Sequence, residues 1–443
     1  MKKKLIEVAL PLEAISAASA HEKAIRRGHP FSIHQWWSRK PLATCRAVLF
    51  AQIVDDPSAN PEKFPTEEAR AAERARLFRI IEQLVKWENT NDEKVLNEAR
   101  EEILKSTGGD PPPVFDPFCG GGSIPLEALR LGLEGRGSDL NPVAVLGSKA
   151  LIEIPAKFRG SRPVNPSARE LRAEREWSGV QGLAEDVRFY GKWIHDEAAR
   201  RVGRLFPKIG LPEEEGGGEA TVVAWLYCRT VTCPNPACGA VMPLASKYLL
   251  RRNKEGNTWI QPLADKRNND VRFEIRKGVG APPEPPKTGR GAKFKCFTCG
   301  QPSEEQYVKD EGKAGRIGTR LMAIAAEGKK GRIYLPPDER HIKTAESPAP
   351  AWKPEQELSG DKRAIWCRLY GLDSFDKLFT PRQITALNIF TDLVGEARER
   401  VRTDAAAAGM IDDRVPLDGG GTGATAYADA VATYLALAVS KTT

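Results

Sequence analysis

The sequence contains no run of eighteen apolar residues, so it predicts no membrane-spanning helix. It begins with the basic stretch Met1-Lys2-Lys3-Lys4, but no long apolar segment follows, and a secretory signal peptide is therefore not expected. No internal repeat is visible either. Together these absences predict a cytoplasmic protein without a membrane partner.

The composition is that of an ordinary globular protein, with 41% hydrophobic and 28% charged residues among 443. This length exceeds one small domain and allows a sizeable core. Lysine and arginine number 67 against 59 acidic residues, which gives a net charge of +8. A basic balance favours a polyanionic partner such as nucleic acid, although a basic protein without such a partner has the same composition.

The most informative motif is the glycine-rich stretch Asp116–Ser123, which reads Asp-Pro-Phe-Cys-Gly-Gly-Gly-Ser. A strand is predicted just before it, at 114–115, and a helix just after it, at 124–131. A second strand is predicted at 135–140, followed by a helix at 142–152. This order is typical of a Rossmann-like sheet that binds a nucleoside cofactor.

Each part of this motif suits S-adenosylmethionine. Gly120 and Gly122 lack a Cβ and so let the backbone approach a cofactor closely. The N-terminus of the following helix offers N–H groups to the methionine carboxylate. Asp139, at the end of the second strand, is placed to accept the ribose hydroxyls. Pro125 stands where a dinucleotide fingerprint has its third glycine, and the alternative is a structural turn in another α/β protein.

Four of the eight cysteines form two close pairs, Cys233 with Cys238 and Cys296 with Cys299, and each pair is followed by glycine. Four thiolates in two such knuckles favour a closed, structural zinc site of the zinc-ribbon type. The alternative is a set of free or redox cysteines. Cys228 lies within a β-rich run and is predicted to be a packed thiol.

Basic residues are frequent between the two pairs, over 251–295, and this stretch is predicted to be a long mobile excursion that contacts phosphates or is merely solvated. These residues are Arg251, Arg252, Lys254, Arg276, Lys277, Arg290, Lys293 and Lys295. Elsewhere the pattern predicts a helical hairpin over 60–106, an irregular segment over 155–185 and a strand over 332–335. Further helices are expected over 5–17, 42–53, 186–206, 312–328, 379–407 and 424–439.

The Asp116–Ser123 stretch followed by Asp139-Leu140-Asn141-Pro142 resembles the cofactor motifs of DNA amino-methyltransferases. With the tryptophan pair and Arg-Lys-Pro of Trp36–Pro41 and the cysteine knuckles, the chain resembles prokaryotic adenine-specific DNA methylases that contain a zinc ribbon. That family is often found beside anti-phage genes. The stretches 312–316, 379–383 and 422–427 extend the resemblance along the chain.

The resemblance implies a Rossmann-like, S-adenosylmethionine-dependent methyltransferase core with an inserted zinc ribbon and peripheral helices, acting on adenine N6 in DNA. It divides the chain into 1–55, which completes the cofactor pocket, 56–110, a helical excursion, and 111–219, the core. Residues 220–305 are then the zinc ribbon and 306–443 a helical continuation of the core. The implied cofactor-binding residues are Asp116, Phe118, Gly120, Gly122, Asp139, Asn141, Lys40 and Pro41.

One element of the family is missing from this sequence. Its members carry an Asp-Pro-Pro-Tyr-type motif that holds the target amino group, and no Pro-Pro pair here has the required neighbours; Asp110 is followed by three prolines. The resemblance therefore predicts an amino-terminal portion of a methylase, either a fragment or truncated chain that lacks the catalytic half or a chain whose catalytic half is on a second polypeptide. The alternatives are a non-catalytic nucleic-acid-binding subunit of a split methyltransferase or defence system, and an enzyme that acts on RNA.

Overall fold

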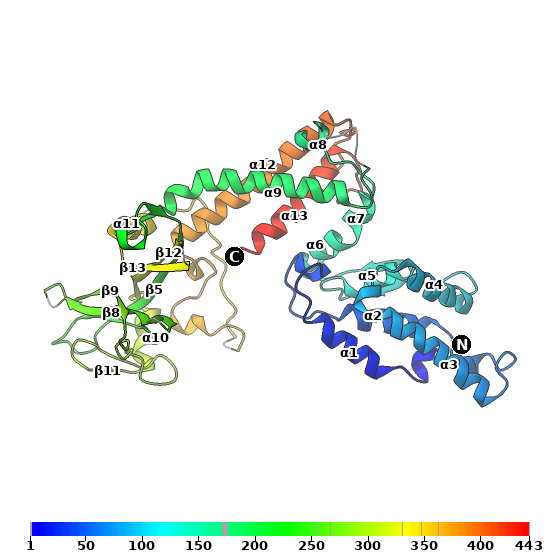
Figure 1. Cartoon of the computed structure of the whole chain (residues 1–443), viewed down its shortest axis with the longest axis horizontal. Helices are drawn as coiled ribbons and strands as arrows, with labels where there is room; N and C mark the ends of the chain where they lie inside the picture. Colours follow the sequence, from blue (N-terminus) through cyan, green and yellow to red (C-terminus); the bar gives the residue numbers. More distant parts are fainter. Residues whose placement is uncertain are drawn as a thin grey trace. The chain divides into compact units, whose positions relative to one another are not determined.

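The structure is a computed structural model that describes residues 2–170, 176–254, 256–265, 267–329, 331–346, 348–361 and 363–442. The chain forms two compact units, the first comprising residues 1–194 and 393–443 and the second residues 195–392. Both divisions fall within long helices, α9 (Gln181–Val202) and α12 (Pro381–Ala407) (Figure 1).

The first unit is mainly helical, and its longer helices are labelled in Figure 1. Besides its parts of α9 and α12, its helices are α1 (Leu12–Glu22), α2 (Leu42–Ile53), α3 (Glu67–Leu84), α4 (Glu93–Thr107), α5 (Ser123–Arg130), α6 (Pro142–Leu151), α7 (Glu153–Lys157), α8 (Pro166–Glu170) and α13 (Ala424–Ser440).

Helix α2 is the centre of this unit's core, in contact with α1, α3, α4 and α5. Its sequence is apolar on almost every side, and Ala47, Phe50 and Ala51 are fully buried. A helix that is apolar all round must be surrounded by others, which explains its position. The predicted hairpin of α3 and α4 is confirmed, and it packs Leu77 and Ile81 into the same core.

The predicted order of strand, loop, helix and strand around the glycine motif is also confirmed. Strands β1 (Val114–Asp116) and β2 (Gly135–Gly137) pair in parallel, with Phe115 opposite Arg136, and α5 connects them. Helix α6 follows, with Asn141 as its N-cap. Among the described residues these two strands pair only with each other, so a larger Rossmann-like sheet stays a prediction.

The second unit is built from small antiparallel sheets. The largest has the strand order β13-β12-β5-β6, and a second has the order β7-β8-β9. The strands of the unit are β3 (Ile209–Gly210), β4 (Glu219–Ala220), β5 (Val222–Thr232), β6 (Val241–Pro243), β7 (Leu249–Asn253), β8 (Gly256–Asp265), β9 (Asp270–Gly278), β10 (Phe294–Lys295), β11 (Pro302–Ser303), β12 (Gly318–Gly328) and β13 (Gly331–Leu335). Its shorter helices are α10 (Glu305–Lys313) and α11 (Glu339–Glu346).

The prediction of a helix over 312–328 is wrong. Helix α10 ends at Lys313, and β12 occupies most of the segment. Because β12 lies between β5 and β13, successive residues such as Ala323 and Ile324 are buried on opposite faces, and no alternation of polar and apolar residues marks the strand. Its alanines favour a helix locally, and pairing with the two neighbouring strands overrides that preference.

The prediction of a mobile excursion over 251–295 is wrong for the first part of this stretch, which contains the end of β7 and all of β8 and β9. Strands β8 and β9 form a long regular hairpin there, with Ile260, Val271 and Phe273 buried. Residues 271–276 alternate apolar and charged side chains, which is a strand pattern that the high proportion of basic residues obscured.

Two smaller differences concern helix boundaries. The segment 155–185 is only partly irregular, because it includes the end of α7, the described α8 and the start of α9 at Gln181; residues 171–175 lie outside the described part. The helix expected over 5–17 is a short 3-10 turn, Leu5–Glu7, followed by α1. The strand at 332–335 and the helices at 379–407 and 424–439 are confirmed by β13, α12 and α13. None of the described helices has both the length and the apolar character needed to cross a bilayer.

Candidate cofactor loop and metal centre

The glycine loop is closed by the carboxylate of Asp139. The backbone N–H of Gly120 donates to Asp139 Oδ2 at 2.9 Å, and that of Asn141 donates to Oδ1 at 2.8 Å. The N–H groups of Asn141 and Gly120 hold the pKa of Asp139 below its usual range, so the carboxylate is ionised at neutral pH. A carboxylate has about four lone-pair sites, so two remain for further donors.

The loop requires glycine at two positions. Gly120 and Gly122 adopt φ values of +50° and +78°, in the left-handed region. A Cβ on Gly120 would lie 2.6 Å from Trp36 Nε1, and one on Gly122 would lie 2.9 Å from Ser148 Oγ. Gly122 is also the N-cap of α5, and no side chain caps the N–H groups of this helix, which leaves them available to an anion.

The segment that contains the tryptophan pair, residues 29–41, is called the tryptophan segment below. It contacts the glycine loop through Trp36. Trp36 lies against Gly120, and Phe31 lies against Gly121. The neighbouring Trp37 points into solvent, with 83% of its surface exposed. The hollow between the tryptophan segment, the loop and α6 has a volume of only about 20 Å³, which is too small for a nucleoside cofactor.

A buried carboxylate holds the start of this segment against α2. Glu22 accepts hydrogen bonds from the backbone N–H groups of Leu42 and Ala43, at 2.9 and 3.0 Å, and so caps α2 from outside. His29 Nδ1 accepts from Phe31 N–H, which leaves the proton on Nε2 to donate to Glu22 at 2.9 Å. The segment is thereby tied to the core.

The other predicted cofactor residues are only partly brought together. Asp116 accepts a hydrogen bond from the Phe118 N–H at 3.0 Å, while the Phe118 ring is 79% exposed. Pro41 is the N-cap of α2, and Lys40 is exposed with its ammonium 3.4 Å from Ser38 Oγ. Neither has a described contact with the loop.

Two residues near the loop were not predicted from the sequence to have a role there. Ser148 on α6 donates to the carbonyl of Gly120 at 3.1 Å, and Glu127 on α5 bonds Arg46 of α2 at 2.5 Å. Neither has a sequence signal, since a serine or a glutamate on a helix is usually a surface residue.

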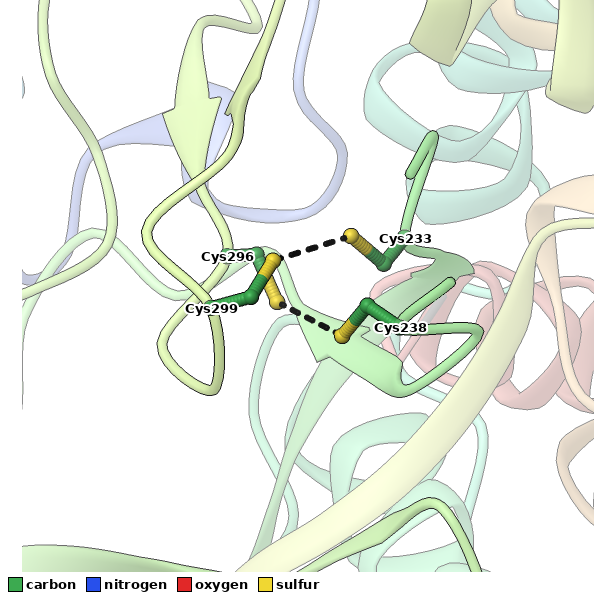
Figure 2. A group of neighbouring side chains, drawn as sticks. All are labelled: Cys233, Cys238, Cys296 and Cys299. Atoms are coloured by element: carbon green, nitrogen blue, oxygen red, sulfur yellow. Dashed lines mark hydrogen bonds between the residues drawn. The ribbon is translucent and has the colours of Figure 1, made fainter. Parts of the chain in front are cut away.

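The four predicted metal ligands lie together in the second unit, and Figure 2 shows their sulfur atoms turned toward one another. The Sγ atoms of Cys233 and Cys299 are 3.6 Å apart, those of Cys238 and Cys296 are 4.0 Å apart, and all four lie within 4.8 Å of one another. Sulfur atoms at tetrahedral corners about 2.3 Å from one ion would be about 3.8 Å apart, whereas a disulfide would join two of them at about 2.0 Å. This cluster could therefore hold a metal ion.

The backbone around the cysteines supports the same role. Each knuckle turns through a glycine in the left-handed region, Gly239 at φ +56° and Gly300 at φ +76°. The following N–H, from Gln301, lowers the pKa of Cys299 to about 7, while burial raises the pKa of Cys233. Backbone N–H donors of this kind stabilise thiolates. By contrast, burial raises the pKa of the Cys228 thiol to about 12, which fits its predicted role in packing.

The basic residues between the knuckles lie in different surroundings: some form ion pairs and others line a hollow. Lys293 and Lys295 pair with Glu304 and Glu284 at 2.9 and 2.8 Å. Four cations line one hollow of about 450 Å³, together with Glu214 and Glu215, and Lys277 among them pairs with Glu215. These cations, called the basic hollow below, are Arg251, Lys277, Lys329 and Arg332. Arg251 and Lys277 come from the predicted basic stretch, and the other two come from the β12–β13 turn and β13.

Comparison with known proteins gives one partial match. A family described as "Protein of unknown function (DUF1156)" matches residues 9–80, which run from just before α1 into α3 and include Trp36 and Arg46. No curated protein and no solved structure matches the chain.

Proposed function

We propose that the chain is the cofactor-binding part of an S-adenosylmethionine-dependent DNA methyltransferase that acts on the amino group of adenine. The observation that carries this proposal is the glycine loop between two parallel strands, tied to an ionised Asp139 and followed by an uncapped helix N-terminus. These donors and acceptors match a ligand with a carboxylate and a ribose. When bound, the cofactor supplies the methyl group on its sulfonium.

In this proposal each part of the loop has a task. Gly120 and Gly122 let the backbone approach the ligand, the first N–H groups of α5 hold its carboxylate, and Asp139 accepts from its ribose. Asp116, Phe118, Asn141, Lys40 and Pro41 would complete the pocket around the loop. A motif that holds a base flipped from the duplex would come from outside these 443 residues, which by themselves are expected to transfer no methyl group to DNA.

Substitution of Asp139 tests the cofactor assignment. Asp139→Ala is expected to weaken S-adenosylmethionine binding about 10- to 150-fold, because it removes charge-assisted hydrogen bonds to the ribose. Isothermal titration calorimetry on the purified chain measures this loss. Asp110→Ala, another acidic residue of the same unit, should leave the affinity unchanged. No binding by the unaltered chain, or equal binding by Asp139→Ala, would contradict the proposal.

The proposed partner is DNA, and the basic hollow supports it. Its four cations outnumber its two carboxylates, and Lys329 and Arg332 have no ion pair among the described residues. The same surface would serve the alternative function, a non-catalytic nucleic-acid-binding subunit.

The proposed location is the cytoplasm, where reducing conditions keep the cysteines as thiols available to a metal.

Neutralising the basic hollow tests the DNA assignment. The double variant Lys329→Gln, Arg332→Gln is expected to reduce the slope of log affinity against log salt by about 0.9 for each phosphate that the protein no longer neutralises. Fluorescence anisotropy with a labelled duplex at several salt concentrations gives the slope. Arg363→Gln, an exposed cation of the same unit that pairs with Asp361, is the control. An unchanged slope in the double variant would remove the hollow from the DNA interface.

We also propose that the ion of the cysteine cluster is zinc in a structural site. Four sulfur ligands and no open position suit Zn²⁺, which favours tetrahedral thiolate coordination.

A further inference from the structure

A second pocket in the same unit has no part in the proposed methyl transfer. It has a volume of about 570 Å³ and is lined by residues of β5, β10, α10 and the 3-10 turn Cys367–Tyr370. This volume lies in the range of small-molecule sites. The stretch 312–316, noted in the sequence only for its resemblance, forms part of its wall.

Backbone packing gives this pocket a fixed wall. A Cβ on Gly312 would lie 2.3 Å from the Tyr370 carbonyl oxygen, and one on Gly371 would lie 2.0 Å from the Gly312 carbonyl oxygen. The end of α10 and the 3-10 turn therefore pack backbone against backbone. Tyr370 also donates its hydroxyl to Glu305 at 3.0 Å, and the Lys309 ammonium lies 5.8 Å from the centre of its ring. The tyrosine is held in place before any ligand arrives.

The pocket exposes an aromatic face to solvent. Trp366 is 67% exposed, although it lines the pocket, and its ring meets Tyr370 edge to face at 5.9 Å. Phe294 and Val308 add buried apolar surface to the lining. An exposed indole beside an apolar pocket is suited to stack on a planar ring.

Cations surround the same pocket. Lys377 is paired with Asp373 at 2.7 Å, whereas Arg229, Lys287 and Lys313 form no ion pair among the described residues. Three unpaired cations on one pocket favour an anionic group such as a phosphate.

We propose that this pocket binds a nucleotide, with the base stacked on Trp366 and the phosphate held by Arg229, Lys287 and Lys313. The aromatic face of the pocket matches the planar base of a nucleotide, and its cations match the phosphate. A purely apolar ligand or a purely anionic ligand would use only one of these two features. This site does not depend on methyl transfer or on the glycine loop. The nucleotide is either free or part of a single strand, and the two sources share this chemistry.

Calorimetry on the full chain tests the site with dAMP and with the single-stranded hexanucleotide (dA)6. Trp366→Ala is expected to weaken binding roughly 5- to 150-fold, the range for stacking of one base on an aromatic residue. Trp366→Phe should retain most of the affinity. Trp352→Ala, which removes a tryptophan of the same unit that is 62% exposed and does not line the pocket, is the matched control.

Adenosine, which lacks the phosphate of dAMP, distinguishes the contact with the base from the contacts with the phosphate. The double variant Arg229→Gln, Lys313→Gln is expected to weaken dAMP binding roughly tenfold and to leave adenosine binding unchanged. Binding of dAMP that depends on Trp366 supports a free nucleotide, and binding of (dA)6 alone that depends on Trp366 supports a strand. The Lys329→Gln, Arg332→Gln background removes any contribution of the basic hollow to (dA)6 binding. The proposal is overturned if neither ligand binds, or if Trp366→Ala binds both as well as the unaltered chain.

Discussion

Removing the metal from the cysteine cluster is expected to unfold the β-structure around it. Structural zinc sites contribute about 10–16 kcal/mol of apparent binding free energy, which is comparable to the whole stability of a typical domain. The apolar cluster around the cysteines is small, and Cys233 and Cys296 are themselves among its buried members. Few other contacts would therefore hold the two knuckles together without an ion.

Loss of a single cysteine ligand is expected to have nearly the same effect as removal of the metal. Cys296 is 1% exposed and sits in the turn after β10, while Cys233 directly follows the long strand β5. The ion would join these two segments, which are far apart in the sequence. Cys296→Ala leaves three ligands and a buried gap, so we expect this variant to lose the metal and to expose apolar surface.

Metal analysis and circular dichroism measure this result. The purified chain should contain one zinc ion, and cobalt substitution should give the absorption of a tetrahedral thiolate site. Cys296→Ala should contain less than a tenth as much zinc as the unaltered chain. Cys367→Ala, a half-buried cysteine outside the cluster, should keep its metal. A Cys296→Ala chain that retained full zinc and its native spectrum would show that the cluster is not a metal site.

Loss of a buried arginine in the first unit is expected to lower its stability by about 3–5 kcal/mol. Arg46 on α2 is 1% exposed and donates to Glu127 Oε2 at 2.5 Å, and Glu127 on α5 is fully buried. Arg46 also donates to the Leu84 carbonyl oxygen at 2.5 Å. Arg46→Met would leave Glu127 buried with Arg130 as its remaining described cation.

Thermal unfolding measures this effect, and a drop of roughly 6 to 20 °C corresponds to that range for a unit of this size. The double variant Arg46→Met, Glu127→Leu should recover at least half of the loss, because a buried ion pair replaced by apolar groups of similar volume is often neutral. Arg188→Met, which breaks an exposed pair with Glu185, should cost no more than about 1 kcal/mol.

This ion pair also connects the core to the candidate cofactor loop. Because Glu127 lies on α5, directly after the loop, Arg46→Met should increase hydrogen exchange at Gly120 and Gly122 as well as lowering stability. A variant with unchanged stability and unchanged exchange would show that the pair is dispensable.

Local patterns predicted much of the secondary structure and the residues of both candidate sites. The glycine motif is preceded by a strand and followed by a helix, as glycines and the apolar periodicity indicate. The cysteine spacing predicted each knuckle because each is a local turn, whereas the tertiary structure brings the two knuckles together, with all four sulfurs within 4.8 Å of one another. The error at β8 and β9 came from a local strand pattern that the basic residues obscured, whereas the error at β12 came from pairing with neighbouring strands. The residues of β12 favour a helix by themselves and form a strand because β5 and β13 pair with it on both sides.

The sequence by itself determined the short-range features of this protein: the glycine loop, the two knuckles, most helices and the basic charge. Each depends on residues within one turn or one helix, so their spacing along the chain is sufficient. Only the tertiary structure decided that Trp36 covers Gly120, that Asp139 closes the loop and that Arg46 meets Glu127. It alone gathered Trp366, Tyr370 and the cations Arg229, Lys287 and Lys313 around one pocket. These interactions join residues from 19 to more than a hundred positions apart, and no local preference specifies which of them meet.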